Sequence, residues 1–343
     1  MKNRLFHNVG GRFEDVSEKS GAADPGDGFV ALWADLDNDG DLDLAMANGV
    51  IKDGTVPQIY RNNGDGTFTN MTKAAGIDEP PSYGAIGIAL GDYDRDGRVD
   101  LLINGLEPAP NRLYHNEGNW KFKDVAQKAG AVQPVHNGFV CFFFDYNNDG
   151  YPDLFTTSLA SWTAVIDGLR EGYRPPKNAM HPDVGRLFRN NRNGTFTDVT
   201  YEAGLYLPVG VMGAGVADVD NDGYMDLYLG VGDPQMSRLE PNRFFHNNGD
   251  GTFTDLTDHV GFHRPGNKGH GVSFVDIDED GDLDIYAQLG GHYPGDFARN
   301  AFYKNLKGNQ NRWLQVDLVG VKSNRAGIGA QLTVRSGDFL VYR

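Results

Sequence analysis

Apolar and polar positions along this chain fall into a pattern that recurs about every 55 residues. Each repeat opens with an apolar run rich in Gly, Ala, Val and Phe, which predicts a strand buried on both faces. A polar loop of nine residues follows, and a second apolar run comes after it. The predicted first strands are Gly28–Ala34, Ala85–Gly91, Gly138–Phe144, Val211–Ala217 and Gly269–Val275. The predicted second strands are Leu42–Ala47, Leu101–Asn104, Leu154–Thr157, Leu227–Gly230 and Ile285–Leu289.

A second motif, of the form N-R-L-F-x-N followed by G-T-F-T-D-V, closes each repeat, as at Asn242–Asn247 and Gly251–Leu256. An aromatic strand, an Asn/Gly turn and a period-two strand predict a β-hairpin. Four antiparallel strands per repeat are typical of a β-propeller blade. The predicted fold class is therefore all-β, a β-propeller of four-stranded blades. Five repeats and a leading hairpin at Asn3 predict about six sheets, and seven blades are possible in an intact protein.

Sustained helical periodicity is absent from the sequence, so few helices are expected. One repeat is longer by about 15 residues, which places an insertion between residues 154 and 185, with a helical candidate at Thr163–Glu171. Near the C-terminus, alternation at Leu314, Val316 and Leu318 and again over Ile328–Val334 predicts two strands. We therefore expect a propeller over residues 1–306 and a small β domain, incomplete in this sequence, over residues 307–343.

The nine-residue loop reads D-x-[DN]-x-D-G-x-x-D in all five copies, which we call the Asp loops: loop 1 (35–43), loop 2 (92–100), loop 3 (145–153), loop 4 (218–226) and loop 5 (276–284). Carboxylates at positions 1, 3, 5 and 9 and a backbone carbonyl at position 7 supply the hard oxygen ligands that Ca²⁺ prefers, and Gly at position 6 permits the sharp turn. An EF-hand is excluded because position 12, where its closing Glu belongs, holds Met46, Ile103, Thr156, Leu229 and Ala287. The sequence predicts about five calcium ions, one per loop, that stabilise the fold.

The predicted calcium ligands are Asp35, Asp37, Asp39, Asp41 and Asp43; Asp92, Asp94, Asp96, Arg98 and Asp100; Asp145, Asn147, Asp149, Tyr151 and Asp153; Asp218, Asp220, Asp222, Tyr224 and Asp226; and Asp276, Asp278, Asp280, Asp282 and Asp284.

Composition changes this picture in three ways. The net charge of −16 disfavours nucleic acid and anionic membrane surfaces as partners, and five divalent ions would offset ten of these charges. A single cysteine, Cys141, excludes an internal disulfide framework, and its alignment with small apolar residues in the other repeats indicates a packing role. The sequence has no apolar run long enough to cross a bilayer, and its first residues are not expected to act as a signal peptide because they lack an apolar run.

The alternation of these two motifs over residues 3–306 resembles the FG-GAP/VCBS repeats of integrin-α-like propellers. The stretch Asn311–Gly337 resembles the start of an ASPIC/UnbV domain. With these repeats and this stretch, the chain resembles the cartilage-acidic-protein-like family. This resemblance implies a calcium-binding propeller that is secreted, periplasmic or at the cell surface, without catalytic activity.

Three segments could form a ligand surface. The insertion carries Trp162, Arg170, Tyr173 and Arg174, a mixture of aromatic and basic side chains that is enriched in binding surfaces. The connector of the last repeat carries His292 and Tyr293. His270 stands where the other repeats have apolar residues, so either a ligand or a structural role is open to it.

Our favoured hypothesis is a non-catalytic binding or adhesion module for a protein or a glycan. One alternative is a polysaccharide lyase or hydrolase that uses the channel mouth, although the chain has no Gly-x-Ser-x-Gly, His-Glu-x-x-His or phosphate-binding loop. Another is a purely structural domain of a larger secreted protein.

Overall fold

The computed structural model of the chain describes residues 2–26, 28–48, 56–78, 84–105, 110–133, 137–168, 177, 181–232, 240–262, 268–290, 298–321 and 324–343. It divides into two compact units. The first comprises Met1–Phe143, Asn191–Phe196 and Asp317–Ala330, and the second comprises Phe144–Asn190, Thr197–Val316 and Gln331–Arg343.

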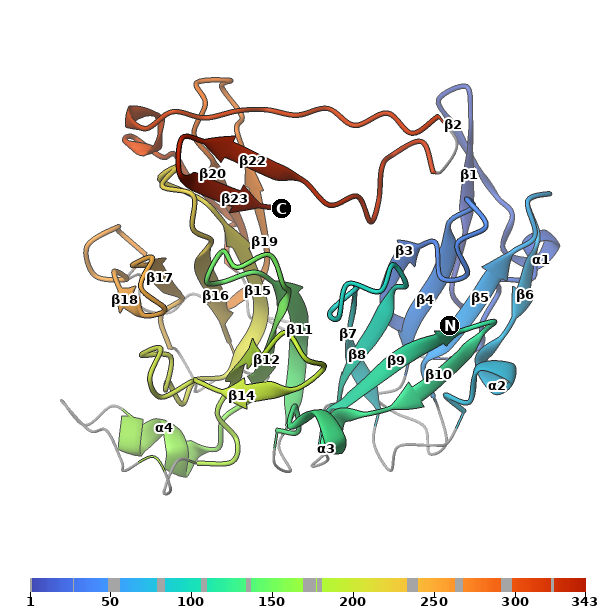
Figure 1. Cartoon of the computed structure of the whole chain (residues 1–343), viewed down its shortest axis with the longest axis horizontal. Coiled ribbons are helices and arrows are strands. Elements are labelled where there is room, and N and C mark those ends of the chain that lie inside the picture. The colour runs from blue at the N-terminus through green and yellow to red at the C-terminus, as the bar shows by residue number, and fades with distance from the viewer. Residues whose placement is uncertain are drawn as a thin grey trace. The chain divides into compact units, whose positions relative to one another are not determined.

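The first unit begins with a two-stranded hairpin and continues into two four-stranded blades (Figure 1). The hairpin is β1 (Phe6–Val9) and β2 (Arg12–Asp15). Blade 1 is β3 (Gly28–Ala34), β4 (Asp43–Asn48), β5 (Gln58–Asn62) and β6 (Phe68–Asn70). Blade 2 is β7 (Ala85–Gly91), β8 (Asp100–Gly105), β9 (Arg112–Gly118) and β10 (Lys121–Asp124).

The remaining repeats form three further blades. Blade 3 has the order β11 (Gly138–Phe144), β12 (Asp153–Ser158), β13 (Arg186–Asn190) and β14 (Phe196–Asp198). Blade 4 is β15 (Val211–Ala217), β16 (Asp226–Val231), β17 (Arg243–Asn247) and β18 (Phe253–Asp255). Blade 5 shows three strands, β19 (Gly269–Val275), β20 (Asp284–Leu289) and β21 (Ala301–Tyr303). The fold class is confirmed: five propeller blades of antiparallel strands, with the leading hairpin as a separate sheet.

Glycine allows the first strands of neighbouring blades to approach each other closely. A Cβ at Gly87 of β7 would lie 2.1 Å from the carbonyl oxygen of Phe139 in β11, and one at Gly213 of β15 would lie 1.4 Å from that of His270 in β19. No larger residue fits at these two contacts, which explains the glycine-rich composition of the strands. Burial on both faces holds for β7 but not for β3 and β19, where alternate side chains stay accessible and Phe29 is 48% exposed.

Apolar clusters join successive blades within each unit. In the first unit, Ile59 of β5, Leu101 and Ile103 of β8, and Trp120 and Phe122 beyond β9 belong to one buried cluster. In the second unit, Tyr228, Phe244 and Phe262 pack with Ile285 and Leu289 of blade 5. Burial of these side chains stabilises each pair of blades by the hydrophobic effect, at about 25 cal/mol per Å² of apolar surface.

Helices are few and short among the described residues, as expected. Three single turns follow the hairpins, α1 (Ser17–Ser20), α2 (Thr72–Ala75) and α3 (Ala126–Ala129), and each ends at a glycine in the left-handed region. The insertion carries α4 (Trp162–Gly168), which confirms the predicted helix as far as Gly168. No described helix is long and apolar enough to cross a membrane.

The C-terminal segment differs from the prediction. Residues around Leu314, Val316 and Leu318 form no strand, and Leu314 is 67% exposed. A 3₁₀ turn, η2 (Gly308–Gln310), precedes them, and the paired strands are β22 (Thr333–Ser336) and β23 (Phe339–Tyr342). Alternation alone was misleading because a strand also needs a hydrogen-bonding neighbour, and only β22 and β23 have one here.

Candidate metal centres

Each Asp loop is held by hydrogen bonds from its own backbone. In loop 1, the carboxylate of Asp35 accepts the amides of Asp39 and Gly40 at 3.1 and 2.9 Å, and Asp39 accepts the amide of Asp41 at 2.9 Å. The same bonds recur in loops 2, 3 and 5, whereas in loop 4 the amide of Asp222 donates to Asp220 in place of Asp218. Position 4 has a positive φ in all five copies, as at Asn38 (62°), and so does the following glycine, Gly40 (99°). Two left-handed residues therefore turn the loop so that its carboxylates converge.

Position 9 has a second role that the sequence did not reveal. Its carboxylate is fully buried in loops 1, 2, 3 and 5 and nearly so in loop 4. In loop 2, Asp100 accepts the amide of Tyr93 at 3.3 Å and that of Asn116, in β9, at 2.8 Å. This Asp therefore ties the loop to the hairpin strand of its own blade through backbone hydrogen bonds.

The last Asn of the N-R-L-F-x-N motif links neighbouring blades, in addition to its predicted place in a β-hairpin. The side-chain amide of Asn116 donates to the carbonyl of Val99 in its own loop, at 3.0 Å, and to that of Leu36 in the preceding loop, at 2.9 Å. In the second unit, Asn247 bridges Met225 and Tyr146, and Asn305 bridges Leu283 and Val219. We call these three residues the bridging asparagines. The sequence carries a signal for this linking role, because Asn ends every copy of the N-R-L-F-x-N motif.

The oxygen atoms of the Asp loops fit a hard cation. In loops 1, 2 and 4, the carboxylates at positions 1, 3 and 5 place ligand atoms within 4.8 Å of one another. Buried side-chain oxygens without a hydrogen bond occur in loops 2, 3, 4 and 5: Asp94 Oδ1, Asn147 Oδ1, Asp218 Oδ1, Asp282 Oδ1 and Asp284 Oδ2. In loop 1, the indole N–H of Trp120 donates to Asp37 at 2.8 Å. An oxygen atom that is buried without a hydrogen-bond donor raises the free energy of the folded state, and a bound cation would remove that penalty.

Burial also disturbs the ionisation of these carboxylates. It raises the pKa of Asp43 to about 7 and that of Asp100 to about 8, although two backbone amides favour the ionised form of each. Burial raises the pKa of Asp218 to about 6, opposed by the nearby Arg343 guanidinium. Without a cation, the loops therefore retain protons that an exposed carboxylate would lose.

The C-terminal hairpin covers loops 3 and 4 of the second unit. Asn148, at position 4 of loop 3, donates to the carbonyl of Leu340 at 2.5 Å and accepts the amide of Tyr342 at 2.9 Å. Arg343 lies 3.0 Å from Asp218 of loop 4, and the ring of Phe339 packs against that of Tyr224. These contacts therefore join the C-terminal hairpin to loop 3 and loop 4.

The predicted ligand surface is described only in part. His270 lies in β19, half-buried, with its backbone against β15. Trp162 begins α4, whereas Arg170, Tyr173, Arg174, His292 and Tyr293 lie outside the described residues.

Cys141 lies in β11 as a free, buried thiol that donates to the carbonyl of Leu102 at 3.6 Å. Burial raises its pKa far above the ordinary value for a thiol. A protonated, inaccessible thiol is a poor nucleophile, which agrees with the packing role inferred from the sequence.

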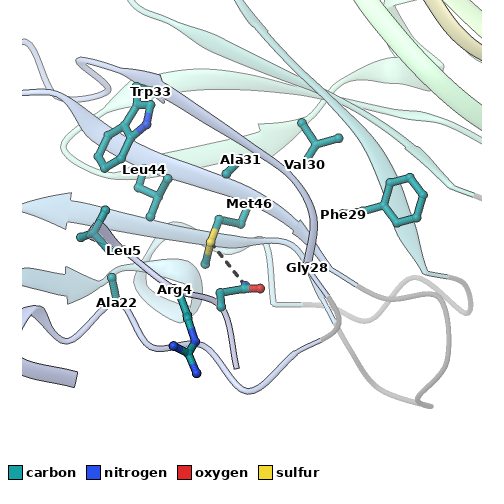
Figure 2. A pocket seen from close by; sticks show the side chains of 11 residues that line it. Arg4, Leu5, Ala22, Gly28, Phe29, Val30, Ala31, Trp33, Leu44 and Met46 are labelled. Carbon is teal, nitrogen blue, oxygen red and sulfur yellow. Dashed lines mark hydrogen bonds between the residues drawn. The ribbon is translucent and has the colours of Figure 1, made fainter. Parts of the chain in front are cut away.

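Blade 1 and the N-terminal segment line a cavity of about 330 Å³ that no sequence pattern predicts. Figure 2 shows its lining, in which the N-terminal segment with Arg4 and Leu5 faces Trp33, Leu44 and Met46 of β3 and β4. The amide of Asn3 points at the sulfur of Met46, 3.6 Å away. The lining is mainly apolar, with Arg4 and Asn3 as its polar side chains.

Five consecutive segments match the description "FG-GAP-like repeat", over residues 1–46, 49–103, 104–156, 179–229 and 232–287. Each of these segments contains one of the five Asp loops. The chain therefore belongs to the FG-GAP-like repeat family.

Among characterised relatives, the chain is similar to cartilage acidic protein 1. It is 30% identical to the Homo sapiens protein over 202 residues, which cover 55% of this chain and 27% of the relative. It is 30% identical to the Xenopus tropicalis protein over 189 residues, covering 53% of this chain and 26% of the relative. The match thus spans about a quarter of the length of these relatives, and it confirms the resemblance to the cartilage-acidic-protein-like family. The ASPIC/UnbV-like start stays a prediction.

Solved structures align over most of the chain but superpose weakly. A rhamnogalacturonan lyase from Bacillus licheniformis aligns with 90% of this chain and 52% of its own, at 14% identity and a TM-score of 0.45. A second structure is that of an Agrocybe aegerita lectin that recognises non-reducing terminal N-acetylglucosamine. Its alignment covers 86% of this chain and 86% of the lectin, at 17% identity and a TM-score of 0.34. At these scores, the superpositions carry no argument about function.

Proposed function

We propose that this protein is a calcium-stabilised, extracytoplasmic binding or adhesion module that recognises a protein or a glycan and has no catalytic activity. The observation that carries the calcium part is the set of buried oxygen atoms without hydrogen-bond donors in four of the five Asp loops. Oxygen-only ligands in a tight loop favour Ca²⁺, which takes six to eight oxygens and tolerates irregular geometry. The ions would be held by positions 1, 3, 5 and 9 and by the carbonyl of position 7.

The role of each ion in this proposal is structural. Every blade repeats the same loop, and position 9 is anchored to the hairpin strand by backbone hydrogen bonds. An ion bound at these carboxylates would join the loop between the first two strands to the third strand of the same blade. Folding and metal binding are then coupled, because the ligands converge only in the folded chain.

The location outside the cytoplasm is supported by the similarity to cartilage acidic protein 1. It also agrees with the chemistry, since extracellular calcium modules operate with weak sites at calcium concentrations of about 10⁻⁴–10⁻³ M. The partner is proposed to contact the insertion, where Trp162, Arg170, Tyr173 and Arg174 combine aromatic and basic character, or the connector that holds His292 and Tyr293.

A binding experiment separates this proposal from its two alternatives. Calcium-loaded protein is screened on glycan and protein arrays, and Trp162→Ala or Arg174→Ala is expected to weaken capture by about 30-fold or more without a change in melting temperature. Ile166→Ala, at an exposed position of α4, serves as the matched control and should leave capture unchanged. Turnover of a polysaccharide that is lost in His270→Ala would instead favour the enzyme, and absence of any ligand would favour a structural domain.

The raised pKa values predict how the stability of the calcium-free protein depends on pH. Protons bind more tightly in the folded chain than in the unfolded chain at Asp43, Asp100 and Asp218. The contribution of this proton binding to the free energy of unfolding is therefore present at pH 4 and is lost as the pH rises towards 8. The hydrogen bond that the His246 ring donates to the Asp226 carboxylate raises the pKa of His246 to about 9, which acts in the same direction between pH 6.5 and 9. In EDTA, the urea midpoint should therefore be lower at pH 8 than at pH 5.5.

The matched measurement repeats both urea curves in excess calcium. Since the cation neutralises the carboxylates, the fall between pH 5.5 and pH 8 should disappear or reverse. A calcium-free protein that is more stable at pH 8 than at pH 5.5 would contradict this prediction.

A further inference from the structure

In blades 2, 4 and 5, one side chain from the third strand points back towards the Asp loop of the same blade. It is the residue before the last Asn of the N-R-L-F-x-N motif, and we call it the hairpin cation. In blade 2 it is His115, whose Nδ1 lies 3.2 Å from Asp100 Oδ1 and 3.6 Å from Asp94 Oδ2. In blade 4 it is His246, whose Nδ1 lies 3.1 Å from Asp226 Oδ1 and 3.6 Å from Asp220 Oδ2. Two different blades thus build the same arrangement to within 0.1 Å.

Blades 1, 3 and 5 do not have an imidazole at this position. They carry Arg61, Arg189 and Lys304, of which Lys304 pairs with Asp278 in loop 5. An arginine or a protonated lysine can only donate hydrogen bonds, whereas a neutral imidazole offers a nitrogen lone pair to a metal. Blades 2 and 4 therefore differ chemically from blades 1, 3 and 5.

The three donors in each of these two blades can meet at one ion. The ligand atoms of Asp94, Asp100 and His115 all lie within 4.8 Å of one another, and so do those of Asp220, Asp226 and His246. This donor set includes position 9 and the histidine, so it differs from the cluster of positions 1, 3 and 5. In blade 4, Arg343 pairs with Asp218, and Asp218 is not one of these three donors.

Two features of the site in blade 2 indicate that a ligand belongs there. Asp94 Oδ1 and His115 Nδ1 are buried atoms that make no hydrogen bond. Asp100 is fully buried, and the amides of Tyr93 and Asn116 fix the direction of its oxygens. Outer hydrogen bonds of this kind orient metal ligands before the metal arrives. In blade 4, Nδ1 of His246 shares a hydrogen bond with Asp226, which metal binding would replace.

We propose that loops 2 and 4 are mixed nitrogen and oxygen sites that accept a borderline transition-metal ion such as Zn²⁺ in competition with Ca²⁺, through Asp94, Asp100 and His115 and through Asp220, Asp226 and His246. Loops 1, 3 and 5 remain oxygen-only sites. Imidazole nitrogen is a good ligand for zinc, copper and nickel and a poor one for calcium, so the hairpin cation selects the metal class. This inference rests on the proposed function, namely that the Asp loops hold divalent cations.

The test measures metal retained by the full chain after dialysis against Zn²⁺ in the presence of excess Ca²⁺. The wild type should retain about two equivalents of zinc, His115→Arg about one, and the double variant His115→Arg/His246→Arg none. Arginine is the residue that blades 1 and 3 already carry, so the variants should fold and should keep the calcium-loaded melting temperature. His259→Arg, at an exposed histidine, is the matched control and should retain zinc like the wild type.

A second readout uses Co²⁺ in place of Zn²⁺, because the position and intensity of its visible absorption change with the donor atoms and the coordination geometry. The wild type should show a cobalt band that the double variant lacks. Retention of zinc by the double variant would overturn the proposal. Calcium binding without zinc binding in the wild type would also overturn it while leaving the proposed function intact, whereas failure to bind either metal would contradict the proposed function itself.

Discussion

Removal of divalent cations with EDTA is expected to lower the melting temperature of this protein by about 25 °C. An ion present at 100 times its Kd stabilises the fold by about 2.7 kcal/mol, so five occupied loops would contribute about 13 kcal/mol. One kcal/mol shifts the melting temperature by about 2 °C in a chain of this size. Differential scanning calorimetry in EDTA and in 2 mM Ca²⁺ measures the change.

The control for this experiment is Mg²⁺ at the same concentration after EDTA removal. Mg²⁺ demands six-fold geometry and gives up its waters reluctantly, so it should restore only a small part of the loss. Equal melting temperatures in EDTA and in calcium would show that the Asp loops fold and persist without ions, and the calcium proposal would fail.

Replacement of the buried carboxylate at position 9 should destabilise the protein even without calcium. Asp100→Ala leaves the amides of Tyr93 and Asn116 without an acceptor at a fully buried site. Each unsatisfied buried donor costs about 1–3 kcal/mol, so the free energy of unfolding should fall by about 3 kcal/mol in EDTA, measured by urea denaturation. In calcium, the loss should be larger because an ion site is also damaged.

Asp96→Ala is the matched control in the same loop. Asp96 is exposed, and water can replace it as the acceptor for the amide of Arg98. Its replacement should cost less than about 1 kcal/mol in EDTA and several times more in calcium. If Asp100→Ala were harmless in EDTA, position 9 would be a metal ligand and nothing else.

The strand pattern was predictable because it is encoded locally. The first strands of all five blades coincide with the predicted ranges, since each is a run of small and apolar residues that ends at an aspartate. The convergence of positions 1, 3 and 5 was predictable for the same reason: the ligands are two residues apart and the turn is fixed by glycine. The C-terminal segment was not, because the partner of a strand cannot be read from its own alternation.

The longer-range roles within the site were beyond the sequence pattern. Asn116 and Leu36 are 80 residues apart, so the repeated Asn looked like part of a turn. The histidines of blades 2 and 4 stand where the other repeats have Arg or Lys, and that exchange does not predict contact with a buried group. Only the fold shows that this position faces a buried carboxylate at about 3 Å.

The bridging asparagines have a consequence for how the protein comes apart. Each amide joins a loop to the one before it, so the departure of one blade strips a hydrogen-bond donor from a buried carbonyl of its neighbour. Unravelling is thereby transmitted from repeat to repeat along each unit. A protease that nicks one connector should consequently release fragments of several blades and no stable single blade.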